Sequence, residues 1–123
     1  MLELPPLSLY IHIPWCVQKC PYCDFNSHES RGAIPEQNYV NALLSDFRQE
    51  LPHFQNRELH SIFIGGGTPS LFAAKSIDTV LSGIEKMVKF SDHIEITLEA
   101  NPGTADAKKF TDFRSAGITR LSI

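Results

Sequence analysis

The sequence predicts an α/β fold in which parallel strands alternate with helices, arranged as the N-terminal portion of a βα barrel of the TIM type. Two observations carry this prediction. Short apolar segments with the two-residue period of strands alternate along the chain with longer segments that have the spacing of amphipathic helices. The resulting order, strand, helix, strand, helix, strand, helix, strand, is typical of a parallel sheet with right-handed crossovers.

The first predicted strand covers residues 7–13 (LSLYIHI). Apolar side chains alternate there with Tyr10 and His12, so one face is apolar and the other carries these two rings. Pro14 ends the strand, because it has no backbone N–H to donate to a ladder. A helix is then predicted at about 35–51. The apolar positions that recur every fourth residue in this helix are Tyr39, Leu43, Phe47 and Leu51.

The second unit begins with a short strand at 61–64 (SIFI). This strand runs straight into the glycine-rich sequence GGGTP at 65–69. A helix at about 73–89 is predicted to follow, because its apolar residues form one stripe. The stripe consists of Ile77, Val80, Leu81, Ile84, Met87 and Val88.

The third unit has a predicted strand at 94–98, followed by the sequence EANPG at 99–103. Thr104 is expected to cap a third helix, and Gly117 is expected at the C′ position where that helix ends. The apolar residues of this helix are Ala107, Phe110 and Phe113. Residues 118–123 (ITRLSI) are the predicted start of a fourth strand.

Three βα units and the start of a fourth strand cannot close a barrel by themselves, because a complete barrel needs about 250 residues. Residues 1–123 are therefore expected to be the N-terminal part of a longer protein. On this interpretation, the remainder of the barrel and any C-terminal domain lie outside the sequence.

The composition excludes several classes of protein. Hydrophobic residues make up 42% of the chain, which is enough for a packed core. With 11 basic and 14 acidic residues the net charge is −3, so the chain offers no basic footprint for nucleic acid. No apolar run is long enough to span a bilayer, and the N-terminal residues lack the pattern of a signal peptide. An odd number of clustered cysteines argues against a secreted disulfide framework, so a cytoplasmic location is expected.

All three cysteines lie within the sequence CVQKCPYC, with the spacing C-x3-C-x2-C. Four thiolates would complete a zinc or iron–sulfur site, whereas three can hold three irons of a cubane [4Fe–4S] cluster and leave the fourth iron open to an outside ligand. The alternative is a structural zinc site, in which the cysteines would be joined by His12 or His28. The cysteines alone leave both interpretations open.

Three separate motifs resemble one known family. The cysteine spacing, with an aromatic residue before the last cysteine, resembles the signature of radical S-adenosylmethionine (SAM) proteins. The longer run LPPLSLYIHIPWCVQKCPYCDFNSH, together with IFIGGGTPS and EITLEANPGT, is similar to the branch that contains oxygen-independent coproporphyrinogen III oxidase and a haem chaperone. The resemblance covers essentially all 123 residues and implies the radical SAM fold, a partial βα barrel.

The resemblance implies two cofactors, a [4Fe–4S] cluster and SAM, whose amino and carboxylate groups would chelate the open iron. The implied cluster ligands are Cys16, Cys20 and Cys23. The implied SAM-binding residues are Tyr10, Tyr22, Gly66, Gly67, Thr68 and Glu99. No catalytic residue is assigned. The cysteine loop (16–23), the glycine loop (65–69) and Glu99 each follow a strand of a parallel sheet, so all three are expected at the same edge of the sheet, where the strands end. Trp15 is expected to pack beside the cysteine loop.

The resemblance favours a haem chaperone, which binds haem and delivers it to a haem-accepting protein. A reductant for the cluster is a further expected partner, and peripheral membrane association is expected through an acceptor protein. The alternative is radical oxidative decarboxylation of coproporphyrinogen III in porphyrin biosynthesis. The oxidase pattern calls for another cysteine two residues after the third, where this sequence has Phe25, so the departure argues against that activity. A zinc-stabilised interaction module would leave the glycine loop and Glu99 unexplained.

Overall fold

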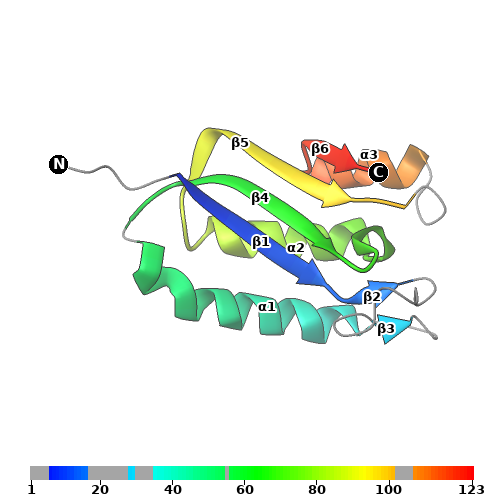
Figure 1. The fold of residues 1–123 in the computed structure, drawn as a ribbon, viewed down its shortest axis with the longest axis horizontal. Coiled ribbons are helices and arrows are strands. Elements are labelled where there is room, and N and C mark those ends of the chain that lie inside the picture. The colour runs from blue at the N-terminus through cyan, green and yellow to red at the C-terminus, as the bar shows by residue number, and fades with distance from the viewer. Residues whose placement is uncertain (1–5, 17–27, 30–34, 55, 102–106) are drawn as a thin grey trace.

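The computed structural model describes residues 6–16, 28–29, 35–54, 56–101 and 107–123. Strands and helices alternate along these residues, as the sequence predicts (Figure 1). The main elements are β1 (Leu7–Ile13), α1 (Glu36–Glu50), β4 (Leu59–Gly66), α2 (Ala74–Glu85), β5 (Phe90–Glu99), α3 (Ala107–Ala116) and β6 (Arg120–Ser122). The shorter elements are β2 (Trp15–Cys16), β3 (His28–Glu29) and the 3-10 turns η1 (Leu51–Phe54) and η2 (Pro69–Leu71).

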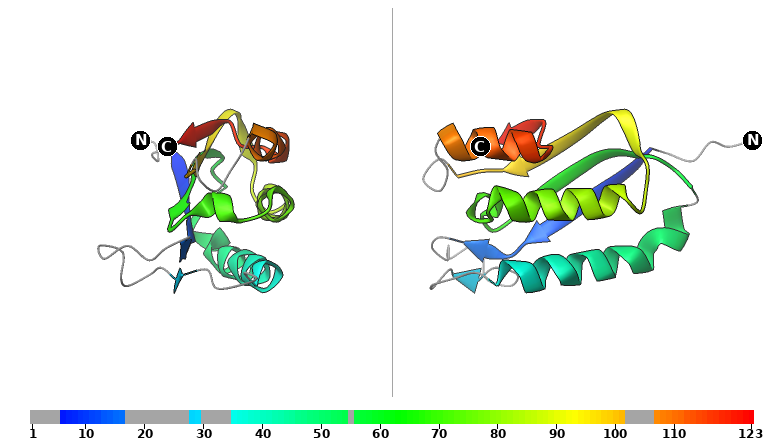
Figure 2. Two further views of the ribbon diagram at one scale, coloured as in Figure 1. Left: turned by 90° about the vertical axis from the view of Figure 1, so that its right-hand side faces the viewer. Right: turned by 180° about the vertical axis from the view of Figure 1, so that it is seen from behind.

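Within the described residues the main sheet has the strand order β1-β4-β5-β6, and every neighbouring pair is parallel. Strands that are neighbours in this sheet follow one another along the chain. The helices α1, α2 and α3 all lie on the same face of the sheet (Figure 2). A sheet that winds in one direction with its helices on one face is the arrangement of a βα barrel, whereas a doubly wound sheet has helices on both faces. The predicted fold class is therefore confirmed.

The hydrophobic core lies between the sheet and the helices. The register of the strands places Leu9, Ile62 and Ile96 side by side in one row across the sheet. The next apolar row, two residues along each strand, is aligned in the same way. From the helices, α1 contributes Val40 and Phe47 to this core. Further core residues are Ile11, Ile13, Ile64, Leu98, Ile77, Val80, Leu81, Ile84 and Phe113. No helix in the described part of the chain is both long and apolar enough to cross a membrane.

Two strands are longer than the sequence suggests. The strand predicted at 61–64 extends over Leu59–Gly66, because Leu59 is fully buried and pairs with Phe90. That same pairing extends the strand predicted at 94–98 to Phe90–Glu99. Near the start of β4 and β5 the strand register shifts, which interrupts the alternation of apolar and polar side chains. The periodic pattern alone therefore does not reveal the first residues of these two strands.

The ends of two other elements also differ from the prediction. The helix predicted at 73–89 ends at Glu85, and the half-buried Met87 and Val88 extend its apolar stripe into the turn that follows. Gly117 has a φ of 120°, which agrees with its predicted position after the third helix. Thr104, its predicted cap, lies outside the described residues.

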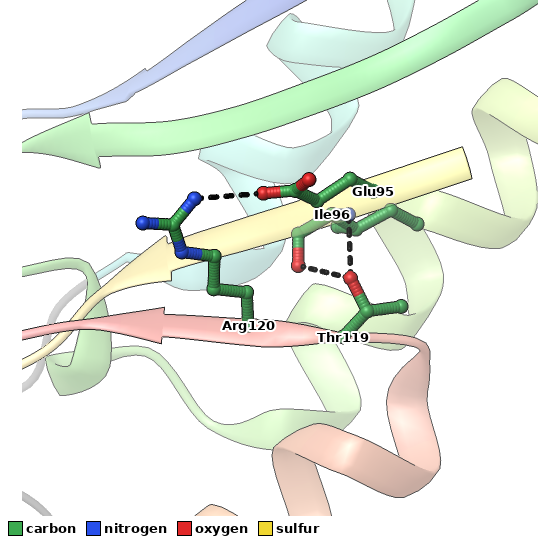
Figure 3. A network of polar contacts seen from close by, with 4 residues as sticks. All are labelled: Glu95, Ile96, Thr119 and Arg120. Carbon is green, nitrogen blue, oxygen red and sulfur yellow. Dashed lines mark hydrogen bonds and ion pairs between the residues drawn. The ribbon is translucent and has the colours of Figure 1, made fainter. Parts of the chain in front are cut away.

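The strand β6 is shorter than the predicted 118–123, because the chain first joins β5 through Thr119 (Figure 3). The Thr119 hydroxyl accepts a hydrogen bond from the Ile96 N–H (2.9 Å) and lies 3.3 Å from the Ile96 carbonyl, to which it donates. One residue later, Arg120 forms an ion pair with Glu95 at 3.0 Å on the face opposite the helices. These contacts fix the register of the edge strand.

Candidate functional site

The sheet face that carries no helix has both exposed aromatic rings and polar side chains. In-register neighbours on this face are Tyr10 and Phe63, with Thr97 and Arg120 continuing the same row across the sheet. Tyr10 is 56% exposed and Phe63 38% exposed, although each lies in the middle of its strand. In a barrel whose helices lie outside, this face is the inner wall.

The carboxyl ends of β1, β4 and β5 meet at one edge of the sheet, where their arrowheads point the same way (Figure 1). Here Gly66, at the end of β4, donates its backbone N–H to the carboxylate of Glu99, at the end of β5, over 3.2 Å. Residues 33 positions apart in the sequence are thereby brought into contact, as the strand-end argument predicts. One such bond leaves further acceptor capacity on the Glu99 carboxylate for a ligand.

The glycine loop is also bonded to the segment that enters the cysteine loop. The Gly67 N–H donates to the carbonyl of Ile13 over 2.8 Å, and the Thr68 N–H donates to the carbonyl of Trp15 over 2.6 Å. Cys16 follows Trp15 in β2. The glycine loop and the chain leading to Cys16 therefore form one hydrogen-bonded unit.

At two glycines of this loop, the protein itself occupies the space that a Cβ would need. Gly66 has a φ of 120°, and a Cβ placed on it would lie 2.6 Å from the Ile13 carbonyl and 2.8 Å from the His12 ring. A Cβ on Gly65 would collide with the Glu99 carboxylate and lie 2.7 Å from the Phe63 ring. The family resemblance implies Gly66 and Gly67 as SAM-binding residues and does not include Gly65.

The Tyr10 ring lies on the helix-free face of the sheet, next to Phe63 in the strand register. It stacks on Phe63, with a centroid distance of 6.1 Å, and its hydroxyl lies 3.1 Å from the His12 Nδ1. Partial burial raises the pKa of Tyr10 above its usual range, and the negative charge of Glu99 raises this pKa further. Alternation in residues 7–13 predicts that Tyr10 and His12 share one strand face. Phe63 was not predicted there, although the alternation within SIFI could have indicated it.

Thr68 and Ser70 continue the glycine loop into the interior. Thr68 is 9% exposed and Ser70 is fully buried. The Ser70 hydroxyl accepts a hydrogen bond from the Asn101 N–H over 3.2 Å, which ties the segment after β4 to the segment after β5. A serine after a glycine run carries no periodic signal, so sequence reasoning did not select it.

Trp15 packs beside the start of the cysteine loop, as expected. Its ring makes an edge-to-face contact with Tyr39 of α1, with a centroid distance of 4.8 Å, and lies 5.8 Å from the ring of the fully buried Phe72. Trp15, Tyr39 and Phe72 form an aromatic group on the helix side of the sheet. It lies next to the edge where β1, β4 and β5 end, which we call the rim.

The rest of the predicted cluster site lies outside the described residues. Cys20, Tyr22 and Cys23 belong to that part of the chain, as does Phe25. For Cys16 the structure gives the backbone, which pairs with Glu29 in β3. Among the described residues, no group of three or more His, Cys, Asp or Glu side chains is arranged to hold a metal ion.

Comparison with known proteins gives consistent matches. "Heme chaperone HemW" of Haemophilus influenzae is 62% identical and that of Escherichia coli 54% identical, each match covering 100% of this chain. A mouse protein named "Radical S-adenosyl methionine domain-containing protein 1, mitochondrial" is 38% identical over 94% of the chain and 26% of its own length. The chain spans about one third of the length of the HemW proteins that it matches, 33% and 32% respectively.

The fold has a match among solved structures. The structure described as "Coproporphyrinogen III oxidase (HemN) from Escherichia coli is a Radical SAM enzyme" superimposes with a TM-score of 0.84 at 29% identity, over 94% of this chain and 27% of that one. The model of the radical SAM superfamily matches residues 10–123, which include the cysteine loop, the glycine loop and Glu99. This chain belongs to the radical SAM superfamily.

Proposed function

We propose that the rim formed by the cysteine loop, the glycine loop and Glu99 holds a [4Fe–4S] cluster and SAM. Cys16, Cys20 and Cys23 would ligate three irons, and the spacing of these thiols fits a cluster with one open iron. The observation that carries the proposal is the hydrogen bonding of Thr68 to Trp15, which places the glycine loop against the residue before Cys16. When bound, the cluster and SAM would supply one-electron redox chemistry.

The residues at the rim would bind SAM in different ways. Glu99 is a carboxylate acceptor suited to sugar hydroxyls or an ammonium group, and it already lies against the glycine loop. Gly66 is exposed and Gly67 partly exposed, so a ligand can approach this backbone although the two N–H groups already bond to Glu99 and Ile13. Thr68 lies beside them, and Tyr10 supplies an exposed ring with a polar tip. Tyr22 would contribute through its backbone next to the last two cysteines.

We further propose that the whole protein is a haem chaperone, which binds haem and passes it to a haem-accepting protein. The identity of 62% and 54% to proteins named as heme chaperones supports this function. Since those proteins are about three times as long as this chain, the proposal takes residues 1–123 as the N-terminal part of the radical SAM core. A reductant for the cluster would be a second partner, and the expected location is the cytoplasm.

The second candidate is oxygen-independent oxidation of coproporphyrinogen III. It is favoured by the structural similarity to HemN, at a TM-score of 0.84. Against it stand the lower identity of 29% and Phe25, which occupies the position of the further cysteine in the oxidase pattern.

Two assays on one preparation separate these functions. The protein, expressed from its complete open reading frame and reconstituted anaerobically, is titrated with haem and mixed with a haem-free acceptor. In parallel it is given coproporphyrinogen III, SAM and a reductant. We expect stoichiometric haem binding and transfer to the acceptor, with no formation of protoporphyrinogen IX. Efficient decarboxylation without haem transfer would reverse the ranking of the two functions.

A further inference from the structure

We propose that Tyr39 is a positioning residue, which fixes the chain entering the cysteine loop against the glycine loop. The inference rests on the proposed role of Cys16 as a cluster ligand. Tyr39 lies on the first turn of α1, on the helix side of the sheet, and its effect would be exerted through His12 and Trp15.

The first contact is a hydrogen bond to the backbone of the edge strand. Successive carbonyls of a strand point to opposite sides within the sheet, and the Ile13 carbonyl accepts from Gly67 on the β4 side. The His12 carbonyl therefore points to the outer side of β1, and there the Tyr39 hydroxyl donates to it. Burial raises the pKa of Tyr39 above its usual range, and the neighbouring Tyr10 adds to this rise, so the hydroxyl keeps its proton.

The second contact is made by the Tyr39 ring. Its edge-to-face contact with Trp15 has a centroid distance of 4.8 Å, and its contact with Phe72 has one of 6.0 Å. Trp15 precedes the cysteine loop, whereas Phe72 follows the glycine loop. One ring therefore packs against both segments that the backbone hydrogen bond from Thr68 joins.

The position of Tyr39 in the chain gives these contacts a further consequence. The cysteines lie between Trp15 and the start of α1 at Glu36, so the contact between Trp15 and Tyr39 brings together the two ends of the segment that carries them. Bringing the ends of a loop together costs conformational entropy, and a contact at the base offsets that cost before any metal binds. Glu36, on the same turn, accepts a hydrogen bond from the Ala73 N–H over 2.9 Å and anchors this end of α1 to the segment after the glycine loop.

The test compares three variants of the protein expressed from its complete open reading frame. Tyr39→Phe keeps the ring and removes the hydroxyl, and Tyr39→Leu removes both contacts. The control is Phe47→Leu, a buried aromatic residue on α1 that packs against Phe54, at the end of the helix away from the rim. Hydrogen exchange is measured on the metal-free protein, and the EPR spectrum of the reduced cluster is recorded with and without SAM.

In Tyr39→Leu the backbone N–H groups of Gly67 and Thr68 should exchange about tenfold faster than in the wild type, because the opposing segment loses its support. The SAM-induced change in the EPR spectrum should become smaller or heterogeneous. Tyr39→Phe should show a weaker form of both effects. Phe47→Leu should lower the melting temperature and leave both signals at the rim unchanged.

Wild-type exchange at Gly67 and Thr68 in Tyr39→Leu, or the same increase in Phe47→Leu, would overturn the assignment. A wild-type protein that takes up no cluster would contradict the proposed function instead, and the exchange data on the metal-free protein would still decide the role of Tyr39.

Discussion

The two faces of the sheet are built from alternating residues of the same strands, yet they have different roles. On the helix side, Ile64 and Leu98 are buried in a continuous apolar core. On the other side, their chain neighbours Phe63 and Glu99 lie on an open wall with Tyr10. Apolar burial on the first face contributes to the free energy of folding, whereas the second face carries the polar groups and exposed rings that we propose contact SAM. Side chains of a strand point alternately to the two faces of the sheet. Two substitutions at adjacent positions should therefore differ in effect, one lowering stability and the other weakening ligand binding.

The largest effect is expected from a pair of neighbouring residues in β4. Ile64→Ala should lower the free energy of unfolding by about 2–5 kcal/mol, because it leaves a cavity in the core, and should leave the SAM affinity of the folded protein unchanged. Phe63→Ala should cost only about 1–2 kcal/mol, since the ring is already partly exposed, but should weaken SAM binding through the loss of its stacking on Tyr10. Chemical denaturation and SAM titration check both. Equal effects of the two variants on SAM binding would contradict the division between the faces.

The rim at the end of β4 should respond in both properties at once. Gly66→Ala places a Cβ against the Ile13 carbonyl at a φ of 120°, so it should cost about 1–3 kcal/mol of stability and disturb the contact with Glu99. SAM binding should fall with it. The control is Gly83→Ala in α2, away from the rim, where the added Cβ lies 2.7 Å from the Leu44 side chain, which has to shift, while the helix gains propensity. If both glycine variants had the same stability and SAM affinity, the conformation assigned to Gly66 would be wrong.

A smaller effect is expected from charge on the open face. Glu99→Gln should weaken SAM binding about tenfold, because hydrogen bonds to a carboxylate are stronger than those to a neutral amide, and should change the melting temperature little. Glu95→Gln is the matched control on the same strand face, since Glu95 forms an exposed ion pair with Arg120 and lies away from the rim. Glu95→Gln should lower the free energy of unfolding by about 0–1 kcal/mol and leave the SAM affinity unchanged. Similar SAM affinities for the two variants would contradict a specific role of Glu99 in binding SAM.

The smallest effect is a change in titration. The pKa of Tyr10 is raised by partial burial and by the charge of Glu99, so in Glu99→Gln it should fall but remain above its usual range. A raised pKa in the folded protein favours the neutral phenol, so its contribution to stability is present at lower pH and is lost as the pH rises through the folded value. Phenolate absorbance of Glu99→Gln against wild type, each corrected with a Tyr10→Phe background, measures the shift. An unchanged Tyr10 titration would show that the carboxylate lies farther from the ring.

Much of this arrangement could be predicted from the sequence because it depends on regular periods. Alternation in residues 7–13 and the spacing of apolar residues in the helices predict element types, and strand ends in a parallel sheet predict one common rim. The contact between Gly66 and Glu99 confirms that rim. The lengths of β4 and β5 were missed, because the register shifts near Leu59 and Ser61, where local pattern gives no signal.

Other features of the site depend on contacts between distant residues. The four-residue spacing predicts Tyr39 as one of the apolar residues on the buried side of its helix. That pattern does not reveal that the Tyr39 hydroxyl donates a hydrogen bond to the His12 carbonyl. The hydrogen bond between the Asn101 N–H and the Ser70 hydroxyl likewise depends on how the two loops pack together, so the sequence pattern does not predict it. The roles assigned to Cys20, Tyr22 and Cys23 remain predictions, since these residues lie outside the described part of the chain.

The proposed function requires that the rim bind a three-cysteine cluster whose open iron takes SAM. The most direct test is the metal content and EPR spectrum of anaerobically reconstituted protein from the complete open reading frame, recorded before and after SAM is added, beside Cys16→Ala, Cys20→Ala and Cys23→Ala. We predict about four irons per chain in the wild type, a spectrum of the reduced cluster that changes with SAM, and loss of the cluster in each cysteine variant. Tight stoichiometric zinc without iron uptake, or an iron spectrum that SAM leaves unchanged, would contradict the account.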